Sequence, residues 1–171
     1  MQIFFDVLCD LVSDRDAREL LKKSLDKGVN FFDTSDTYGD GRSEKFLAEL
    51  IKSTSEKIFV TTKLGRRVRG TNYSRGYKQE HMEEFVDRSL INLGTDCIDL
   101  LQLHCPPSEI ISKKETYEMM DEIVKKGKIA HYGVSVFKIS EAMEAIQNPN
   151  VKSIQMVFNI FRQRPAEVFF K

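Results

Sequence analysis

The sequence is poor in cysteine, has no net charge and lacks long apolar runs, and each shortage excludes a class of protein. Its 171 residues include three cysteines, Cys9, Cys97 and Cys105, without a C-x-x-C spacing. A disulfide framework is therefore not expected, and the expected location is the reducing environment of the cytoplasm. Lys plus Arg and Asp plus Glu each total 26, so no overall field attracts nucleic acid or an anionic membrane. The apolar runs fall far short of the roughly 20 residues that cross a bilayer.

The first twelve residues form an atypical apolar segment. They contain Asp6 and Asp10 and lack a basic start and a small-residue cleavage site, so a signal peptide is not expected. Residues 13–171 are expected to form one globular domain, because 41% of the chain is apolar and a chain of this length buries a sizeable core.

Apolar runs of strand length alternate with stretches of helical period, which is typical of an α/β protein with parallel strands. Helices are expected to begin at the N-caps Ser13 and Ser140, and Met143 and Ile146 to face the core from the second of these. The predicted strands are Val29–Asp33, Ile58–Lys63, Ile98–His104, His131–Ser135 and Ser153–Asn159, and the predicted glycine stops are Gly28, Gly94 and Gly127.

One long loop, residues 65–78, mixes basic and aromatic residues. A solvated connection is the favoured interpretation, and contact with phosphate or nucleic acid is the alternative. The residues concerned are Arg66, Arg67, Arg69, Tyr73, Arg75 and Tyr77.

Polar side chains lie at the carboxyl ends of the predicted strands. In parallel α/β sheets and barrels the ligand binds at this edge, because the loops that follow the strands converge there. Each residue alone has an ordinary structural interpretation, as a turn cap, a strand-end lysine or a core imidazole. The set is Asp33, Lys63, His104, Ser135 and Asn159, with Tyr38 five residues after Asp33.

Together, four of these residues form a coherent device for general acid catalysis. A tyrosine has an ordinary pKa near 10, and a neighbouring cation such as Lys63 favours its phenolate. Asp33 would keep Lys63 charged and fix its direction. His104 would orient a carbonyl oxygen beside Tyr38, so the set is suited to carbonyl reduction.

Five segments resemble the aldo-keto reductase family over roughly residues 14 to 171. They follow one another in the family's order, which is far more specific than any single motif. The segments are Phe32–Gly39, Val60–Lys63, Leu93–His104, Gly127–Ser135 and Ser153–Asn159.

The resemblance implies a (β/α)8 TIM-type barrel that uses NADPH, or NADH, to reduce a small-molecule aldehyde or ketone without a metal. By position, Asp33, Tyr38, Lys63 and His104 would be catalytic, with Tyr38 as the proton donor. Ser135 and Gln155 match the positions that hold the nicotinamide carboxamide. The family commonly has Asn after that serine, where this sequence has Val136.

The chain is shorter than such a barrel, which takes about 250 residues. The segments correspond to barrel strands two to six, so a barrel incomplete at both ends is expected. A remnant or binding module that keeps these residues without turnover is the alternative function. A thiol chemistry of His104 with Cys105 is disfavoured, because adjacent strand residues point to opposite faces. A metal between Asp33 and His104 is disfavoured, because such sites usually require three protein ligands. The sequence predicts neither the carbonyl substrate nor the oligomeric state.

Overall fold

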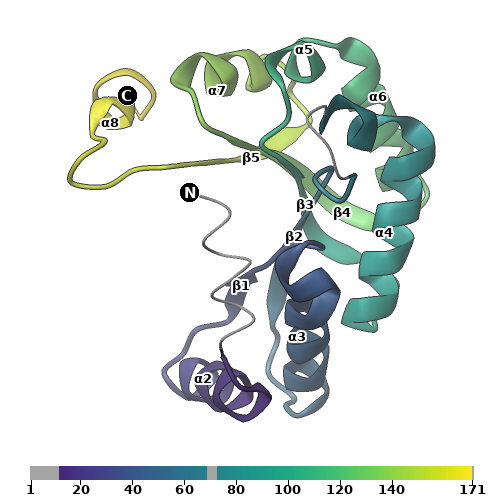
Figure 1. Cartoon of the computed structure of the whole chain (residues 1–171), viewed down its shortest axis with the longest axis vertical. Helices are drawn as coiled ribbons and strands as arrows, with labels where there is room; N and C mark the ends of the chain where they lie inside the picture. Colours follow the sequence, from purple (N-terminus) through teal and green to yellow (C-terminus); the bar gives the residue numbers. More distant parts are fainter. Residues whose placement is uncertain (1–11, 69–72, 171) are drawn as a thin grey trace.

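Five parallel strands form one curved sheet in the computed structural model, which describes residues 12–68 and 73–170. Their order in space is the order in the chain, β1-β2-β3-β4-β5, and every neighbouring pair is parallel. The sheet curls like half of a barrel (Figure 1), which confirms the α/β prediction and the incomplete barrel. The strands are β1 (Phe31–Asp33), β2 (Phe59–Leu64), β3 (Ile98–His104), β4 (Ile129–Val136) and β5 (Val151–Met156).

Most of the helices follow a strand and pack on the outer face of the sheet, whereas the last helix, Arg164–Val168, lies apart from the sheet (Figure 1). Ser13 caps the first of them, accepting a hydrogen bond from the Asp16 N–H at 3.1 Å, as predicted. The predicted stops Gly28, Gly94 and Gly127 all adopt a positive φ, which glycine tolerates without strain. The helices are α2 (Asp14–Asp26), α3 (Arg42–Lys52), α4 (Gln79–Leu93), α5 (Ser108–Ile111), α6 (Lys114–Lys125), α7 (Ile139–Ala145) and α8 (Arg164–Val168), with the 3-10 turns η1 (Tyr38–Gly41) and η2 (Tyr73–Tyr77).

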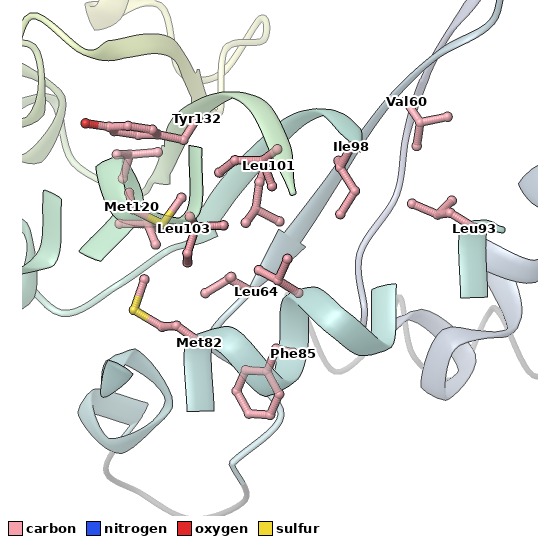
Figure 2. Close-up of a cluster of buried hydrophobic side chains, with 14 of the residues drawn as sticks. Val60, Leu64, Met82, Phe85, Leu93, Ile98, Leu101, Leu103, Met120 and Tyr132 are labelled. Carbon is pink, nitrogen blue, oxygen red and sulfur yellow. The ribbon is translucent and has the colours of Figure 1, made fainter. Parts of the chain in front are cut away.

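The core lies between the outer face of the sheet and the helices. Leu101 and Leu103 of β3 are fully buried there, against Met82 of α4 and Met120 of α6 (Figure 2). On the opposite face, the strand-end side chains are polar, and the apolar Phe31 and Phe59 are exposed. The alternation of a strand thus places one set of side chains in the core and the other on the concave face.

Several predicted boundaries were wrong: β1 begins at Phe31, β4 at Ile129 and β5 at Val151, each two residues from the predicted start. The fifth strand ends at Met156, and Asn159 instead forms an isolated antiparallel bridge with Arg162. Helix α7 begins after Lys138, so Ser140 lies inside it.

The predicted inward face of α7 was also wrong. Met143 and Ile146 are exposed, and the helix buries its small residues Ala142 and Ala145 instead. Small residues on this face let a short helix approach the sheet closely.

The basic loop after β2 is tied to the protein through Arg66, Arg67 and Tyr77, whereas Arg75 is exposed. Tyr77 is buried, and its ring fits against Gly65, where a side chain would clash because a Cβ would lie 2.2 Å from the ring. Arg66 and Arg67 donate to backbone carbonyls. Arg69 and residues 1–11 of the predicted N-terminal segment lie outside the described residues. None of the described helices is long and apolar enough for a membrane span.

Candidate functional site

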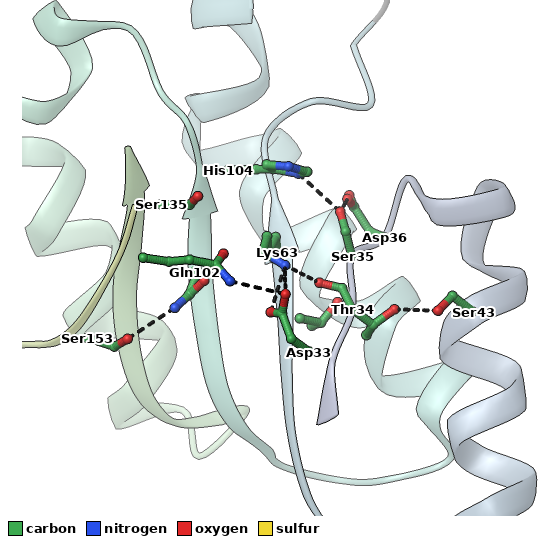
Figure 3. Close-up of polar contacts among 12 residues, drawn as sticks. Asp33, Thr34, Ser35, Asp36, Ser43, Lys63, Gln102, His104, Ser135 and Ser153 are labelled. Carbon is green, nitrogen blue, oxygen red and sulfur yellow. Dashed lines mark hydrogen bonds and ion pairs between the residues drawn. The ribbon is translucent and has the colours of Figure 1, made fainter. Parts of the chain in front are cut away.

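The ends of β1 and β2 place Asp33 and Lys63 in direct contact. The Lys63 Nζ donates to both carboxylate oxygens of Asp33 at 2.7 Å and to the Thr34 carbonyl at 2.8 Å (Figure 3). The Lys63 side chain is 3% exposed and that of Asp33 37%. Burial lowers the pKa of Lys63, and the ion pair with Asp33 opposes that shift. The predicted pairing of these two residues is therefore present.

A tight turn brings Tyr38 back over this ion pair. The Asp36 N–H donates to the Lys63 carbonyl at 3.2 Å, and the Tyr38 N–H donates to the Ser35 carbonyl at 3.1 Å. The Lys63 Nζ lies 5.4 Å from the centre of the Tyr38 ring. The sequence spacing of five residues between Asp33 and Tyr38 is thus the length of this turn.

His104, at the end of β3, is 2% exposed and stands edge-on to the Tyr38 ring, with 6.1 Å between ring centres. Its Nδ1 lies 3.1 Å from the Ser35 Oγ. Burial, with the cations Lys63 and Arg66 adding to it, lowers the pKa of His104 to about 3. The imidazole is therefore neutral near neutral pH.

Ser135 and Gln155 form the opposite wall. The Ser135 Oγ lies 3.4 Å from the Cys105 Sγ, and the Gln155 Nε2 donates to Asp33 Oδ2 at 3.1 Å. All six residues line one cavity of about 300 Å³. Asn159 is exposed and is not among the lining residues, so it lies outside this site.

Two residues of the site were not assigned from the sequence, and the expectation that Cys105 points away from the face of His104 was wrong, because both line the cavity. Arg66 donates to the His104 carbonyl at 2.9 Å, and the Tyr77 hydroxyl donates to the same carbonyl at 2.8 Å. Cys105 has a φ of 49°, which ends the strand and turns its side chain into the cavity beside His104. Arg66 and Tyr77 belong to the basic loop, but no sequence signal assigns their partner.

The disfavoured thiol chemistry gains no support from the site. Burial raises the pKa of Cys105, which opposes formation of the reactive thiolate. The described residues include no group of three His, Cys, Asp or Glu side chains placed to hold a metal ion.

Comparison with known proteins agrees with the geometry. The model of the aldo/keto reductase family matches residues 9–171. The uncharacterized oxidoreductase YqkF of Bacillus subtilis is 34% identical over 155 residues, which are 88% of this chain and 50% of that protein. The chain spans about half the length of the curated relatives it matches.

Two solved structures are similar in fold. The aldo-keto reductase AKR11C1 from Bacillus halodurans, solved in its holo form, has a TM-score of 0.78 and 32% identity over 91% of this chain and 52% of its own. An aldo-keto reductase from Klebsiella pneumoniae in complex with NADPH has a TM-score of 0.69 and 23% identity over 83% and 48%. At that lower identity the likeness concerns the fold alone.

Proposed function

Because this chain belongs to the aldo/keto reductase family, we propose that it carries the proton-transfer site of an NADPH-dependent reductase, with NADH as the possible substitute. The substrate class is a small aldehyde or ketone, which is converted to the alcohol. The observation that carries the proposal is one cavity that joins a buried lysine paired with an aspartate, a tyrosine and a neutral histidine.

Tyr38 donates the proton to the substrate oxygen. The Lys63 ammonium, 5.4 Å from the ring centre, stabilises the negative charge that develops on the phenol oxygen as its proton leaves. Asp33 holds Lys63 in place through both carboxylate oxygens. A group of this kind contributes about 10²- to 10⁴-fold to a rate.

His104 orients the carbonyl. A neutral imidazole donates one hydrogen bond without competing as a proton source, and the low pKa of His104 keeps it neutral. The cavity contains both Tyr38 and His104, so a carbonyl oxygen between them would accept a hydrogen bond from each.

The opposite wall fits the carboxamide end of a nicotinamide. Ser135 offers a hydroxyl and Gln155 an amide, which are the donors and acceptors a carboxamide needs. A cavity of about 300 Å³ has room for the nicotinamide end of the cofactor rather than for the whole dinucleotide. When bound, the cofactor would supply the hydride to the carbonyl carbon.

The first test is Tyr38→Phe, measured by reduction of a panel of aldehydes and by cofactor binding. We expect reduction to fall about 10²- to 10⁴-fold while cofactor affinity is retained. Tyr117→Phe is the matched control, because the buried Tyr117 hydroxyl has no hydrogen-bond partner in the described part of the chain. Undiminished turnover in Tyr38→Phe would remove Tyr38 as the proton donor.

A second variant and a melt separate the reductase from a non-catalytic relative. Lys63→Met is expected to reduce turnover as strongly as Tyr38→Phe, and unchanged rates across the pH range would contradict the role of Lys63.

NADPH at 100 times its dissociation constant should stabilise the fold by about 2.7 kcal/mol in a thermal melt. A chain that binds NADPH but reduces no carbonyl compound would be a binding module.

A further inference from the structure

A short chain of buried polar atoms runs from the cavity into the protein behind His104 (Figure 3). The Ser35 Oγ lies 3.1 Å from His104 Nδ1 and donates to Asp36 Oδ1 at 3.2 Å. Ser35 and Asp36 are both fully buried. Neither residue belongs to the proton-transfer site described above, although both lie in the turn between Asp33 and Tyr38.

We propose that Ser35 and Asp36 are positioning residues that set which nitrogen of His104 carries the proton, and so whether His104 donates or accepts a hydrogen bond in the cavity. This inference rests on the proposed function for its consequence. Its structural content, the coupling of three side chains, stands without turnover.

The ionised state of Asp36 fixes one tautomer. The Ser35 hydroxyl then donates to Asp36 Oδ1, and the Thr37 N–H donates to the Ser35 Oγ at 3.3 Å. The Ser35 hydroxyl has a single proton, which is then committed to Asp36, so its contact of 3.1 Å with His104 Nδ1 is a hydrogen bond only when His104 donates. The Thr37 Oγ1, also 3.1 Å from the Ser35 Oγ, is the remaining neighbour of this oxygen. In this state Nε2 carries no proton and accepts a hydrogen bond from the cavity side.

One added proton reverses the two hydrogen bonds that link His104, Ser35 and Asp36. A proton enters at His104 Nε2, the Nδ1 proton passes to Ser35, and the Ser35 proton passes to Asp36 Oδ1. The result is a carboxylic acid that donates to Ser35, a hydroxyl that donates to Nδ1, and an imidazole with its proton on Nε2. His104 is neutral before and after, and only Asp36 changes charge.

The surroundings favour Oδ1 as the atom that takes the proton. Asp36 Oδ2 is buried without a hydrogen-bond partner in the described part of the chain. An O–H at Oδ2 would lack an acceptor, whereas an O–H at Oδ1 has the Ser35 oxygen within reach.

Charged groups around the chain place the change near neutral pH. Burial, reinforced by the carboxylate of Glu44, raises the pKa of Asp36 to about 7, against the lowering effects of Arg67 and Arg88. Charged and titratable groups surround His104, Ser35 and Asp36, and they come from β2, the loop after β2, the turns η1 and η2, and helices α3 and α4. They are Lys63, Arg66 and Arg67, Tyr38, Tyr77, Glu44 and Arg88.

The consequence for the proposed reaction is directional. Below the midpoint of Asp36, Nε2–H donates to a carbonyl oxygen, which suits binding of the aldehyde or ketone. Above it, Nε2 accepts from a hydroxyl, which suits binding of the alcohol. We expect the KM of the carbonyl substrate to rise roughly tenfold across this transition, the effect of one hydrogen bond.

The test is to read the tautomer directly by two-bond nitrogen–proton NMR of the whole chain labelled with 15N-histidine. His81→Gln and His131→Gln assign the His104 signals. In the unsubstituted chain we expect the His104 proton on Nδ1 at about pH 9 and on Nε2 at about pH 5. The pH midpoint of this change should equal the midpoint of the Asp36 titration, which is followed by the 13C signal of the Asp36 carboxyl group. Asp36→Asn should make the tautomer independent of pH, and Ser35→Ala should uncouple it from Asp36.

Two further variants keep the test independent of folding. Ser35→Thr retains the hydroxyl and should restore the coupled transition. Ser43→Ala removes another hydroxyl that bonds the same turn, at Thr34, and should leave the transition unchanged. A single tautomer throughout the Asp36 titration, or the same transition in Ser35→Ala, would overturn the proposal.

The kinetic outcome separates this inference from the proposed function. A tautomer change without any carbonyl reduction would keep the coupling and reject the reductase. Reduction with a fixed tautomer and a flat KM would keep the reductase and reject the coupling.

Discussion

The two walls of the cavity differ in how firmly the fold holds them. On one wall, the buried groups Lys63 and His104 stand on strands that have a neighbour on both sides, and each is bonded to the turn after β1. On the other, Gln155 stands on the outermost strand β5, whose residues are mostly half-buried. Beyond it, Ile160 is 77% and Phe161 92% exposed.

The difference shows where packing within the protein fixes the geometry of the cavity and where a bound molecule can help to fix it. Lys63 and His104 are held by neighbouring strands on both sides and by hydrogen bonds, as preorganised acid–base groups need to be. On the opposite wall Ser135 is buried on β4, but Gln155 on the edge strand β5 has few such constraints, so a bound molecule can contribute much of the order of Gln155. Four predictions test this contrast, from the largest effect to the smallest.

Truncation in the first wall should be costly and truncation beyond the second should not. Leu103 precedes His104 in β3 and is fully buried in the core. The substitution Leu103→Ala should therefore lower the free energy of unfolding by about 2–5 kcal/mol. Ile160→Ala removes a side chain of similar size from the surface and should stay within about 0.5 kcal/mol. Chemical denaturation of both variants makes the comparison, and equal losses would erase the contrast.

Asp36→Asn should stabilise the chain increasingly as the pH rises. Because the pKa of Asp36 is raised from 3.8 to about 7, the folded state binds the extra proton between these values. The stability that Asp36 contributes through this bound proton is fully present below about pH 4 and is lost as the pH rises through 7. The variant should therefore match the parent near pH 4 and exceed it by up to about 4 kcal/mol above pH 8.

Asp40→Asn provides a control of opposite sign for that titration. Hydrogen bonds from Arg67 and Arg88 lower the pKa of Asp40, so its contribution is present above its ordinary pKa and is lost on acidification. Asp40 is largely exposed, and the effect should be small. Denaturation midpoints measured across the pH range distinguish the two, and parallel curves for both variants would contradict the assigned shifts.

Two adjacent threonines of β2 separate a bonded hydroxyl from an unbonded one. The Thr62 hydroxyl donates to the buried Glu44 at 2.7 Å, whereas the buried Thr61 hydroxyl has no partner in the described part of the chain. Thr62→Val leaves a carboxylate oxygen without its donor and should cost about 1–3 kcal/mol. Thr61→Val, the same change one residue away, should be neutral or stabilising in the same denaturation assay. Equal costs would mean that the hydroxyl of Thr62 does not hold Glu44.

The second wall should respond in binding rather than in stability. Gln155→Ala removes one exposed hydrogen bond to Asp33 and should change the unfolding free energy by less than about 1 kcal/mol. If Gln155 holds a carboxamide, affinity for NADPH in a calorimetric titration should fall roughly tenfold. Lys152→Ala, at an exposed position of the same strand, is the control. An unaltered affinity in Gln155→Ala would remove it from the proposed cofactor contacts.

Much of the fold could be predicted from the sequence because the apolar runs and glycine stops are local signals. Ile98–His104 was predicted to the residue, and Gly94 ends α4 as expected. The start and the buried face of α7 were not predictable from its Ser and Met residues, since the space left beside the sheet selects Ala142 and Ala145.

The candidate site was partly predictable for the same reason. The sequence by itself determined that Asp33, Lys63 and His104 close three successive parallel strands, because the strand pattern places their carboxyl ends on one edge. Only the tertiary structure decided that Ser35 and Asp36 stand behind His104 and that Arg66 and Tyr77 hold its carbonyl. The contacts that these residues make with His104 join positions 27 to 69 residues apart, and such contacts are set by packing, which no local pattern records.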